Sequence, residues 1–310
     1  MKVLVTCPPM LGLIDEFRAV FAAANVELLA PPVVQTLSED ELVGILPKQD
    51  GWIAGDDPAT RRVLSAGAAG RLRALVKWGI GTDNVDFDAA RDLKLAVSNT
   101  PGMFGREVAD VAMAYVIGLA RDLFFIDRCV RDGGWPKPQG ISLDGKVMAL
   151  VGLGDIGSNV AIRAHAAGIR VIAYDPRIEP GSANTGVEVR RWPAGLEEAD
   201  FLVLTCPLTP DNHHMVDVAV LARAKPGLRL VNVARGPLVS EVALVEALRS
   251  GKVLSAALDV MEVEPLVAGS PLLEFDRCIF GSHNGSNTIE GVRRASHQAI
   301  RQLFASLGIQ

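Results

Sequence analysis

Residues 152–157 read Gly-Leu-Gly-Asp-Ile-Gly, a spacing of glycines that can bind a phosphate group. The first glycine permits a tight turn, the second leaves room for a pyrophosphate, and the third lets a helix pack closely on a strand. The free N–H groups and the positive end of that helix would hold the anion. We therefore predict a dinucleotide site at Gly152, Gly154 and Gly157, together with Asp155 and Ile156.

Asp175 lies eighteen residues after Gly157, at the end of the apolar run from Arg170 to Tyr174. A carboxylate in that position accepts hydrogen bonds from the ribose hydroxyls and repels a 2′-phosphate. Arg177 could offset part of that repulsion. The sequence therefore predicts NAD rather than NADP as the cofactor.

Strand and helix patterns alternate around these residues along the chain. Strands are predicted at residues 2–6, 26–29, 51–54, 72–78, 147–151, 170–174, 201–205, 229–233, 254–259 and 278–281. Helices are predicted at residues 13–24, 38–46, 59–66, 106–131, 158–167 and 240–250, and Ser38 with Glu41 forms a capping box. Strands separated by single helices imply parallel sheets covered on both faces. The predicted fold class is α/β, with two doubly wound, Rossmann-like domains and a cleft between them.

The composition favours a small-molecule partner. The chain has 310 residues, enough for about two domains, and 49% of them are hydrophobic. Its net charge of -5 provides no basic field for a nucleic acid or an anionic membrane. Pro8 and Pro9 interrupt the apolar start, which argues against a signal peptide, and the apolar helix candidate at 111–120 is too short to cross a bilayer. We expect a cytoplasmic protein with no membrane and no nucleic-acid partner.

The cysteines and the paired histidines do not suggest a metal. The four cysteines are scattered, at Cys7, Cys129, Cys206 and Cys278. We interpret them as buried, reduced thiols. His213 and His214 are adjacent, and adjacent side chains point apart on most backbones, so we expect a solvated loop there.

Two loops in the first unit could be functional. Residues 77–86 read Lys-Trp-Gly-Ile-Gly-Thr-Asp-Asn-Val-Asp and place glycines just past a predicted strand, where backbone N–H groups can point at a carboxylate. An ordinary turn is the alternative interpretation. Residues 99–102, Asn-Thr-Pro-Gly, end the unit and start the long helix. Because the first unit has no dinucleotide fingerprint, we expect it to supply the substrate side.

Four further stretches follow strands of the second unit. They are Pro-Leu-Thr at 207–209, Val-Ala-Arg-Gly at 233–236, Ala-Leu-Asp-Val-Met-Glu-Val-Glu-Pro at 257–265 and Ser-His-Asn-Gly-Ser-Asn-Thr at 282–288. With the fingerprint and residues 79–86, this ordered set resembles the D-isomer-specific 2-hydroxyacid dehydrogenases, most closely the phosphoglycerate dehydrogenase branch. The resemblance implies hydride transfer between NAD(H) and a D-2-hydroxyacid/2-oxoacid pair.

The resemblance also implies roles for three side chains. Arg235 would hold the substrate and polarise its carbonyl, His283 would exchange the hydroxyl proton, and Glu264 would orient the imidazole and favour its protonated form. Such a reaction needs a cation and a proton-exchanging group, so these residue types suit it. Without the family, a histidine and a glutamate this far apart are more often structural.

The same resemblance implies the ligand contacts. Backbone N–H groups from Gly79 to Gly81 would bind the substrate carboxylate, and Asp259 would approach the nicotinamide carboxamide. Beyond the fingerprint, the implied cofactor-binding residues are Asp175, Pro176, Thr205, Cys206, Pro207, Val233, Ala234, Asp259, His283 and Gly285. The implied substrate-binding residues are Gly55, Trp78, Gly79, Ile80, Gly81 and Arg235.

A discontinuous domain organisation follows from the resemblance. Residues 1–98 with 287–310 would form a flavodoxin-like substrate domain, completed by a C-terminal helix at 290–307, and residues 99–286 would form the NAD-binding domain. Relatives of this kind form homodimers through the long helix, which lies at 106–131 in this sequence.

The sequence departs from the phosphoglycerate dehydrogenase pattern in three places. Gly55-Asp56-Asp57-Pro58 stands where an arginine is usual, Phe104 replaces an asparagine, and Lys77-Trp78 replaces Arg-Ala. Two carboxylates repel a phosphate, and Trp78 would add bulk at the substrate loop. We therefore predict that phosphoglycerate is a poor substrate. The alternative is a cationic clamp supplied by Lys77, Arg61, Arg62 or Arg106.

A different function class also fits these residues. The related corepressors use this fold as an NAD(H)-responsive binding module and keep the arginine, glutamate and histidine, so residues Arg235, Glu264 and His283 do not exclude that alternative. Formate dehydrogenases generally have a glutamine at the position of Glu264, which argues against that relative.

Overall fold

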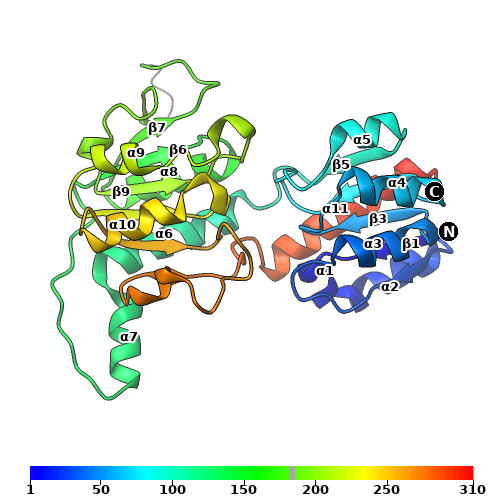
Figure 1. Cartoon of the computed structure of the whole chain (residues 1–310), viewed down its shortest axis with the longest axis horizontal. Coiled ribbons are helices and arrows are strands. Elements are labelled where there is room, and N and C mark those ends of the chain that lie inside the picture. The colour runs from blue at the N-terminus through cyan, green and yellow to red at the C-terminus, as the bar shows by residue number, and fades with distance from the viewer. Residues whose placement is uncertain (182–185, 310) are drawn as a thin grey trace. The chain divides into compact units, whose positions relative to one another are not determined.

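The protein consists of two compact α/β units, each built on its own sheet (Figure 1). The computed structural model describes residues 1–181 and 186–309. One unit combines Met1–Met103 with Asn287–Gln310, and the other is Phe104–Ser286. The predicted α/β class with two doubly wound parallel sheets is confirmed.

The first sheet is parallel throughout its described pairings, in the order β2-β1-β3-β4-β5. This order is that of flavodoxin-like folds. Its strands are β1 (Lys2–Val5), β2 (Glu27–Leu29), β3 (Gly51–Ala54), β4 (Ala74–Lys77) and β5 (Ala96–Asn99). Every residue of β3 and β4 is buried, which fits central strands with helices on both faces.

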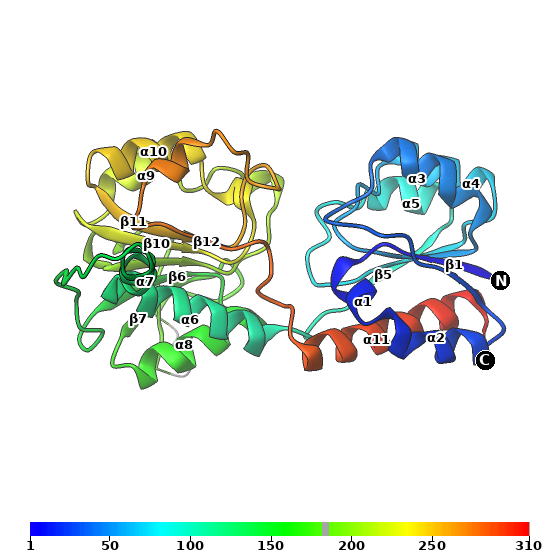
Figure 2. The same ribbon diagram turned by 90° about the horizontal axis from the view of Figure 1, so that it is seen from below.

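Six helices cover the two faces of this sheet. They are α1 (Pro8–Gly12), α2 (Ile14–Ala23), α3 (Glu39–Ile45), α4 (Arg61–Ala69), α5 (Phe87–Asp92) and α11 (Ile289–Leu307). Figure 2 shows α1, α2 and α11 on one face and α3, α4 and α5 on the other. The C-terminal helix α11 packs on β3, β4 and β5, so the chain returns to the first unit at its end. The capping box of Ser38 and Glu41 is confirmed.

The second sheet has the order β12-β11-β10-β9-β6-β7-β8 and is also parallel. From β6 onward this is the strand order of a dinucleotide-binding Rossmann sheet, extended by one strand. Its strands are β6 (Val147–Val151), β7 (Arg170–Tyr174), β8 (Glu188–Val189), β9 (Phe201–Leu204), β10 (Leu228–Asn232), β11 (Val253–Leu258) and β12 (Ile279–Phe280). Helices α6 (Gly105–Arg121) and α8 (Asp155–Ala166) cover one face, and α9 (Val218–Arg223) and α10 (Glu241–Arg249) cover the other (Figure 2).

The long helix predicted at 106–131 is wrong as a single element. Asp122 adopts a left-handed conformation, with φ 52° and ψ 32°, and ends α6 there. A second helix, α7 (Leu123–Arg131), starts immediately afterwards and has no buried residue. A left-handed residue cannot continue a right-handed helix, so the hydrogen-bond ladder is interrupted at this point.

Other differences concern short elements and helix starts. The sequence patterns missed α1, α5, β5 and β8, which are at most six residues long. The fingerprint helix α8 begins at Asp155, inside the glycine motif, rather than at Ser158. Among the described residues, no helix combines the length and apolarity needed to cross a membrane.

Candidate functional site

The glycine turn between β6 and α8 has the geometry of a phosphate-binding loop. Gly152 has φ 93°, and a Cβ there would lie 2.8 Å from the backbone nitrogen of Cys206. A Cβ on Gly157 would lie 2.0 Å from the carbonyl oxygen of Gly152. At Gly154 a Cβ would meet only the Arg177 side chain, at 3.7 Å, so the space above this residue is open. Since no side chain caps α8, its first N–H groups can bind an anion.

Asp175 closes β7 beside that turn and is held by backbone and side-chain donors. Its Oδ2 accepts the N–H of Leu153 at 3.0 Å, and its Oδ1 accepts the N–H of Arg177 at 3.0 Å. The Arg177 guanidinium adds two longer contacts of 3.3 Å. Burial raises the pKa of Asp175, but these donors outweigh it and hold that pKa below its usual value. The carboxylate is therefore ionised at neutral pH. Pro176 follows it and is exposed.

The ends of β9 and β10 lie at the same sheet edge as the glycine turn. Thr205 Oγ1 donates to the carbonyl oxygens of Val151 and Gly152, at 3.0 and 2.9 Å, and ties β9 to the turn. Burial raises the pKa of the Cys206 thiol to about 11, so it stays protonated and acts as a small apolar side chain. Of the remaining cofactor residues predicted on these two strand ends, Val233 and Ala234 are buried and Pro207 is exposed.

His283 and Glu264 meet at the ends of β12 and β11. His283 Nδ1 lies 2.9 Å from Glu264 Oε2, and both side chains are about a fifth exposed, at 23% and 22%. The other oxygen, Oε1, accepts the N–H of Met261 at 3.1 Å, which fixes the carboxylate. With a carboxylate on Nδ1, Nε2 is the ring atom that would exchange a proton with a substrate. The residues expected to form an acid–base pair thus lie within hydrogen-bonding distance.

Asp259 organises the loop that carries His283. The N–H of His283 donates to the Asp259 carbonyl at 2.6 Å, and the N–H of Asn284 donates to Oδ1 at 3.3 Å. The N–H of Gly285 donates to Oδ2 at 2.9 Å, so three consecutive amides bind one residue. His283 itself has φ 55°, a left-handed conformation that costs energy in a non-glycine residue and must be held by its surroundings. The sequence reasoning missed this supporting role of Asp259.

Arg235 follows β10 on a backbone that Asn232 clamps. Asn232 donates from Nδ2 to the Arg235 carbonyl at 2.9 Å and accepts the Ala234 N–H at 3.0 Å. The guanidinium donates to the Ala234 carbonyl at 2.9 Å and is half-buried. A Cβ on Gly236 would lie 1.9 Å from the Met261 carbonyl, so this loop runs directly against the segment that carries Glu264. Asn232 is a buried positioning residue that no sequence signal indicated.

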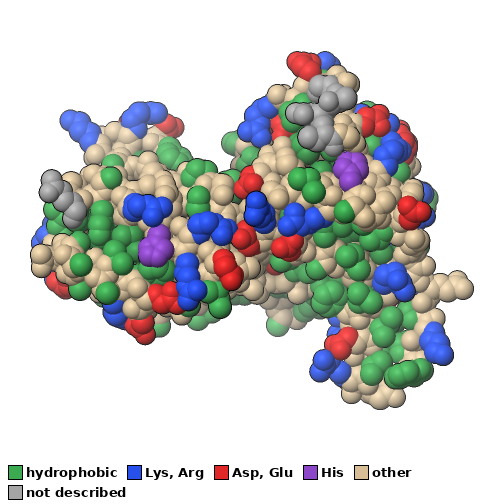
Figure 3. Space-filling model, turned by 180° about the vertical axis from the view of Figure 1, so that it is seen from behind, with side chains coloured by type: hydrophobic (Ala, Val, Ile, Leu, Met, Phe, Trp, Pro, Cys, Tyr) green, Lys and Arg blue, Asp and Glu red, His purple; other side chains and the backbone are tan. Residues whose placement is uncertain are grey.

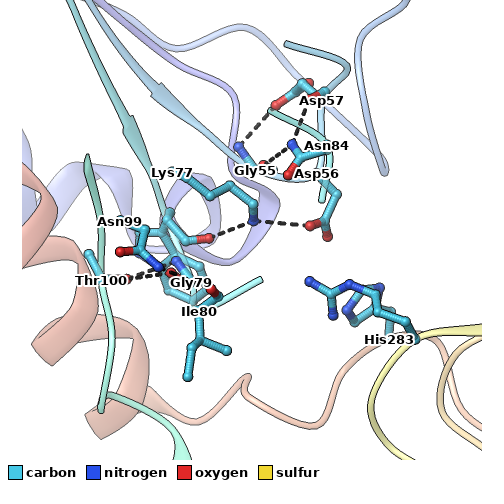
Figure 4. A network of polar contacts seen from close by, with 12 residues as sticks. Gly55, Asp56, Asp57, Lys77, Gly79, Ile80, Asn84, Asn99, Thr100 and His283 are labelled. Carbon is cyan, nitrogen blue, oxygen red and sulfur yellow. Dashed lines mark hydrogen bonds and ion pairs between the residues drawn. The ribbon is translucent and has the colours of Figure 1, made fainter. Parts of the chain in front are cut away.

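Thr100 and Asn99 hold the glycine loop after β4 of the first unit (Figure 4). Gly79 has φ 120°, and its N–H already donates to Thr100 Oγ1 at 2.8 Å, so the expectation that this amide binds a ligand is wrong. Thr100 donates its own N–H to the Gly79 carbonyl at 3.0 Å, and Asn99 Nδ2 donates to the Ile80 carbonyl at 3.0 Å. The N–H groups of Ile80 and Gly81 have no acceptor within the described parts of the chain. Within residues 79–81, these two amides are the donors that the loop can present.

Trp78 does not add bulk at that loop, contrary to the sequence expectation. Its indole is 4% exposed and donates from Nε1 to Ser296 Oγ of α11 at 3.1 Å. Its backbone N–H donates to the Ala54 carbonyl, and its carbonyl accepts Lys77 Nζ. The Trp78 side chain belongs to the core because α11, more than two hundred residues later in the chain, packs on β4, the strand that ends just before Trp78.

Asp56 and Asp57 differ in their surroundings, so the idea of two ligand-facing carboxylates is wrong. Asp57 is fully buried and accepts Thr6 Oγ1, the Leu37 N–H and the Gly55 N–H. Burial raises its pKa, and these donors only partly offset that effect. Asp56 instead forms an ion pair with Lys77, at 3.0 Å (Figure 4). Gly55 is therefore a structural residue whose N–H is already used.

Four cations were considered for a phosphate clamp. Three of them form ion pairs with carboxylates of the first unit. Lys77 is 3% exposed and bonds Asp56 and the Trp78 carbonyl. Arg61 pairs with Asp92, and Arg62 pairs with Glu39 and Asp40. Arg106 is exposed at the start of α6. Three of these four cations are thus already neutralised by carboxylates.

The cysteines and paired histidines differ in part from expectation. The four thiols are free, but Cys129 and Cys206 are only half-buried. The ring centroids of His213 and His214 lie 4.0 Å apart, so these side chains do not point apart, and His214 has φ 53°. In the described portion of the chain, no group of three or more candidate ligand side chains could hold a metal ion.

Known proteins resemble this chain in sequence and in fold. A family model described as "D-isomer specific 2-hydroxyacid dehydrogenase, NAD binding domain" matches residues 113–285. The chain is 36% identical to a hydroxypyruvate reductase of Thermotoga maritima, over 88% of this chain and 90% of that protein. It is 39% identical to a D-3-phosphoglycerate dehydrogenase of Mycobacterium leprae, over 86% of this chain but only 51% of that protein. The chain therefore spans about half the length of that dehydrogenase.

Solved structures superimpose on nearly the whole of this chain. The TT0316 protein of Thermus thermophilus superimposes with a TM-score of 0.87 at 32% identity, covering 99% of this chain and 97% of that one. D-lactate dehydrogenase of Escherichia coli has a TM-score of 0.84 at 26% identity, covering 100% of this chain and 98% of that one. The predicted NAD cofactor is confirmed by the family model, whose description names an NAD-binding domain. The chain belongs to the D-isomer specific 2-hydroxyacid dehydrogenase family.

Proposed function

We propose that this protein is an NAD-dependent D-2-hydroxyacid dehydrogenase in which His283 moves the proton. The observation that carries the proposal is the 2.9 Å contact between His283 Nδ1 and Glu264 Oε2. It orients the ring and assigns the proton exchange with a substrate oxygen to Nε2. Because the relatives named above are reductases and dehydrogenases, they do not favour the alternative of a binding module without turnover.

The residues around the glycine turn fit NAD. The open space at Gly154, the uncapped start of α8 and the ionised Asp175 supply room for a pyrophosphate, donors for it and an acceptor for ribose hydroxyls. When bound, the nicotinamide supplies or takes up the hydride. The strand ends at Thr205 and Val233 would line the remainder of this site.

In the reduction direction, His283 donates its Nε2 proton to the carbonyl oxygen of the 2-oxoacid as the hydride reaches C2. Arg235 stabilises the negative charge that develops on the oxygen and binds the substrate carboxylate. Glu264 stabilises the imidazolium before the transfer and keeps the ring in place after it. In the oxidation direction His283 takes the hydroxyl proton back. Within the first unit, the N–H groups of Ile80 and Gly81 are the donors that we propose for a carboxylate.

We further propose that the substrate is an unphosphorylated 2-oxoacid, which disfavours the phosphoglycerate dehydrogenase branch. The support comes from Lys77, which is buried and neutralised by Asp56, and from Arg61 and Arg62, which are paired with carboxylates. A buried lysine in an ion pair is unavailable to a phosphate. Asp57 is too deeply buried to repel a phosphate directly, so the proposal rests on the paired cations.

A homodimer through α6 and α7 is also proposed. Helix α7 is amphipathic and has no buried residue, and its Leu123, Phe124 and Val130 are each more than 40% exposed. Figure 3 shows hydrophobic side chains gathered on this projecting helix of the second unit. Apolar patches of this kind mark interfaces. Sedimentation of wild type and Phe124→Glu tests this proposal, and a wild-type monomer would refute it.

The free thiols also fit a cytoplasmic location, which we propose on that ground.

The experiment that tests the function measures NADH oxidation by absorbance over a panel of 2-oxoacids. We expect turnover of unphosphorylated compounds such as hydroxypyruvate, glyoxylate or pyruvate, with phosphohydroxypyruvate used much less efficiently. A higher kcat/KM for phosphohydroxypyruvate would refute the substrate class, while leaving the reaction type intact. No turnover with any 2-oxoacid, despite NADH binding, would favour the binding-module alternative.

A further inference from the structure

Helix α6 places a phenol against the loop that carries His283. One face of α6 is buried, and it includes Val108, Ala112 and Tyr115, spaced four and three residues apart. The helix packs on β10 and β11. The Tyr115 hydroxyl lies 3.3 Å from Asp259 Oδ1, and the residue is 9% exposed. A buried phenol needs a hydrogen-bond partner, and Asp259 is the one it contacts.

We propose that Tyr115 is a positioning residue for catalysis, which acts by holding Asp259 and, through it, the backbone of the His283 loop. The inference rests on the proposed function, because it assigns His283 the proton transfer. Tyr115 contacts Asp259, and Asp259 binds the amides of residues 283, 284 and 285, so the hydroxyl is one step from the loop.

Two glycines show how tightly this arrangement is packed. A Cβ on Gly281 would lie 2.2 Å from Asp259 Oδ1 and 2.5 Å from the Tyr115 hydroxyl. A Cβ on Gly285 would lie 3.0 Å from Asp259 Oδ2, with Val108 of α6 next at 3.7 Å. A side chain at Gly281 would therefore displace the carboxylate or the phenol, and one at Gly285 would have little room. Burial, together with the neighbouring Asp259, raises the pKa of Tyr115, so the phenol stays protonated and donates.

The Tyr115 hydroxyl matters because the backbone of His283 is strained. A histidine with φ 55° returns to a commoner conformation unless the backbone amides of its loop are held. When Asp259 loses the Tyr115 bond, its carboxylate can rotate away from the amides of Asn284 and Gly285. His283 would then spend less time with Nδ1 on Glu264 and Nε2 in place for the substrate.

The test compares Tyr115→Phe with Tyr174→Phe. These are the two tyrosines of the chain, and each substitution removes one buried hydroxyl; that of Tyr174 donates to the Ala194 carbonyl at 3.1 Å. We expect Tyr115→Phe to lower kcat roughly tenfold, the loss expected for one hydrogen bond to a charged group. We expect KM for the 2-oxoacid and Kd for NADH to change less than about twofold, and the solvent deuterium isotope effect on kcat to rise. Tyr174→Phe should behave like wild type in each measurement.

Hydrogen–deuterium exchange without substrate gives a readout independent of turnover. In Tyr115→Phe, amides of the loop 282–286 should exchange roughly tenfold faster, while amides of α6 keep their wild-type rate. Unchanged loop exchange, or equal loss of protection in α6, would overturn the proposal, because the hydroxyl would then not hold the loop specifically. The proposed function fails on a separate observation, the retention of activity by His283→Asn.

Discussion

The cofactor preference can be tested at Asp175 with an expected magnitude. Two unit charges about 4 Å apart near a protein surface repel by roughly 4 kcal/mol, which corresponds to about a thousandfold in binding. A 2′-phosphate beside the Asp175 carboxylate meets that repulsion. The Arg177 guanidinium, 3.3 Å from the same carboxylate and 76% exposed, offsets part of it. We therefore expect wild type to prefer NADH over NADPH by roughly a hundredfold in kcat/KM.

Asp175→Asn removes the charge and keeps the shape. The amide oxygen can still accept the Leu153 N–H, so the turn should keep its structure. Ribose hydroxyls lose a charged acceptor, and such hydrogen bonds contribute about 1.5 to 3 kcal/mol each. We expect kcat/KM for NADH to fall roughly tenfold to a hundredfold, while that for NADPH rises. Arg177→Ala is the matched control and should lower the use of NADPH without improving that of NADH.

The assay is initial-rate NADH or NADPH oxidation with one accepted 2-oxoacid, for all three proteins. A wild-type preference for NADPH would refute the assigned role of Asp175, and so would an unchanged ratio of the two specificity constants in Asp175→Asn. In either case Asp175 would be a residue of the turn alone, held by Leu153 and Arg177.

Three further predictions concern binding and stability. Arg235→Ala should raise KM for the 2-oxoacid roughly a hundredfold and lower kcat, whereas NADH titration should show unchanged affinity. Gly152→Ala, at φ 93° and with Cys206 N only 2.8 Å from the new Cβ, should lower the free energy of unfolding by about 1 to 3 kcal/mol in urea denaturation. Burial raises the pKa of Asp50, but the Lys2 N–H and the Arg71 guanidinium lower it by more, so the pKa lies below its usual value. Asp50→Asn should therefore destabilise the fold at pH 7, with a deficit that shrinks as pH falls below about 4 and the wild-type carboxylate is protonated.

Local motifs explain why much of the second unit was predictable. The roles of Gly152, Gly154 and Gly157 all depend on one turn, so the spacing of the glycines within the motif was sufficient to predict those roles. Strand β7, Arg170–Tyr174, follows an apolar run whose ends the sequence shows directly. The pairing of Glu264 with His283 joins two loops and could be expected only from the family resemblance.

Other features depend on contacts that no local pattern records. Trp78 is buried because Ser296 on α11 accepts its indole N–H. Asp57 is buried because Thr6 and Leu37, far away in the sequence, supply its donors. The break at Asp122 requires a left-handed non-glycine residue, which composition and periodicity do not indicate. Tertiary packing decided the positions of Trp78 and Asp57.

His283 moves the proton in the proposed redox reaction, and His283→Asn is the variant that tests this role. His283→Asn keeps a polar side chain of moderate size on the loop and removes the acid–base group. We expect its kcat to fall roughly a hundredfold to ten-thousandfold, as general acid–base catalysis contributes that much, while the Kd for NADH measured by fluorescence titration is unchanged. Near-normal kcat in a folded variant with wild-type NADH affinity would contradict the account.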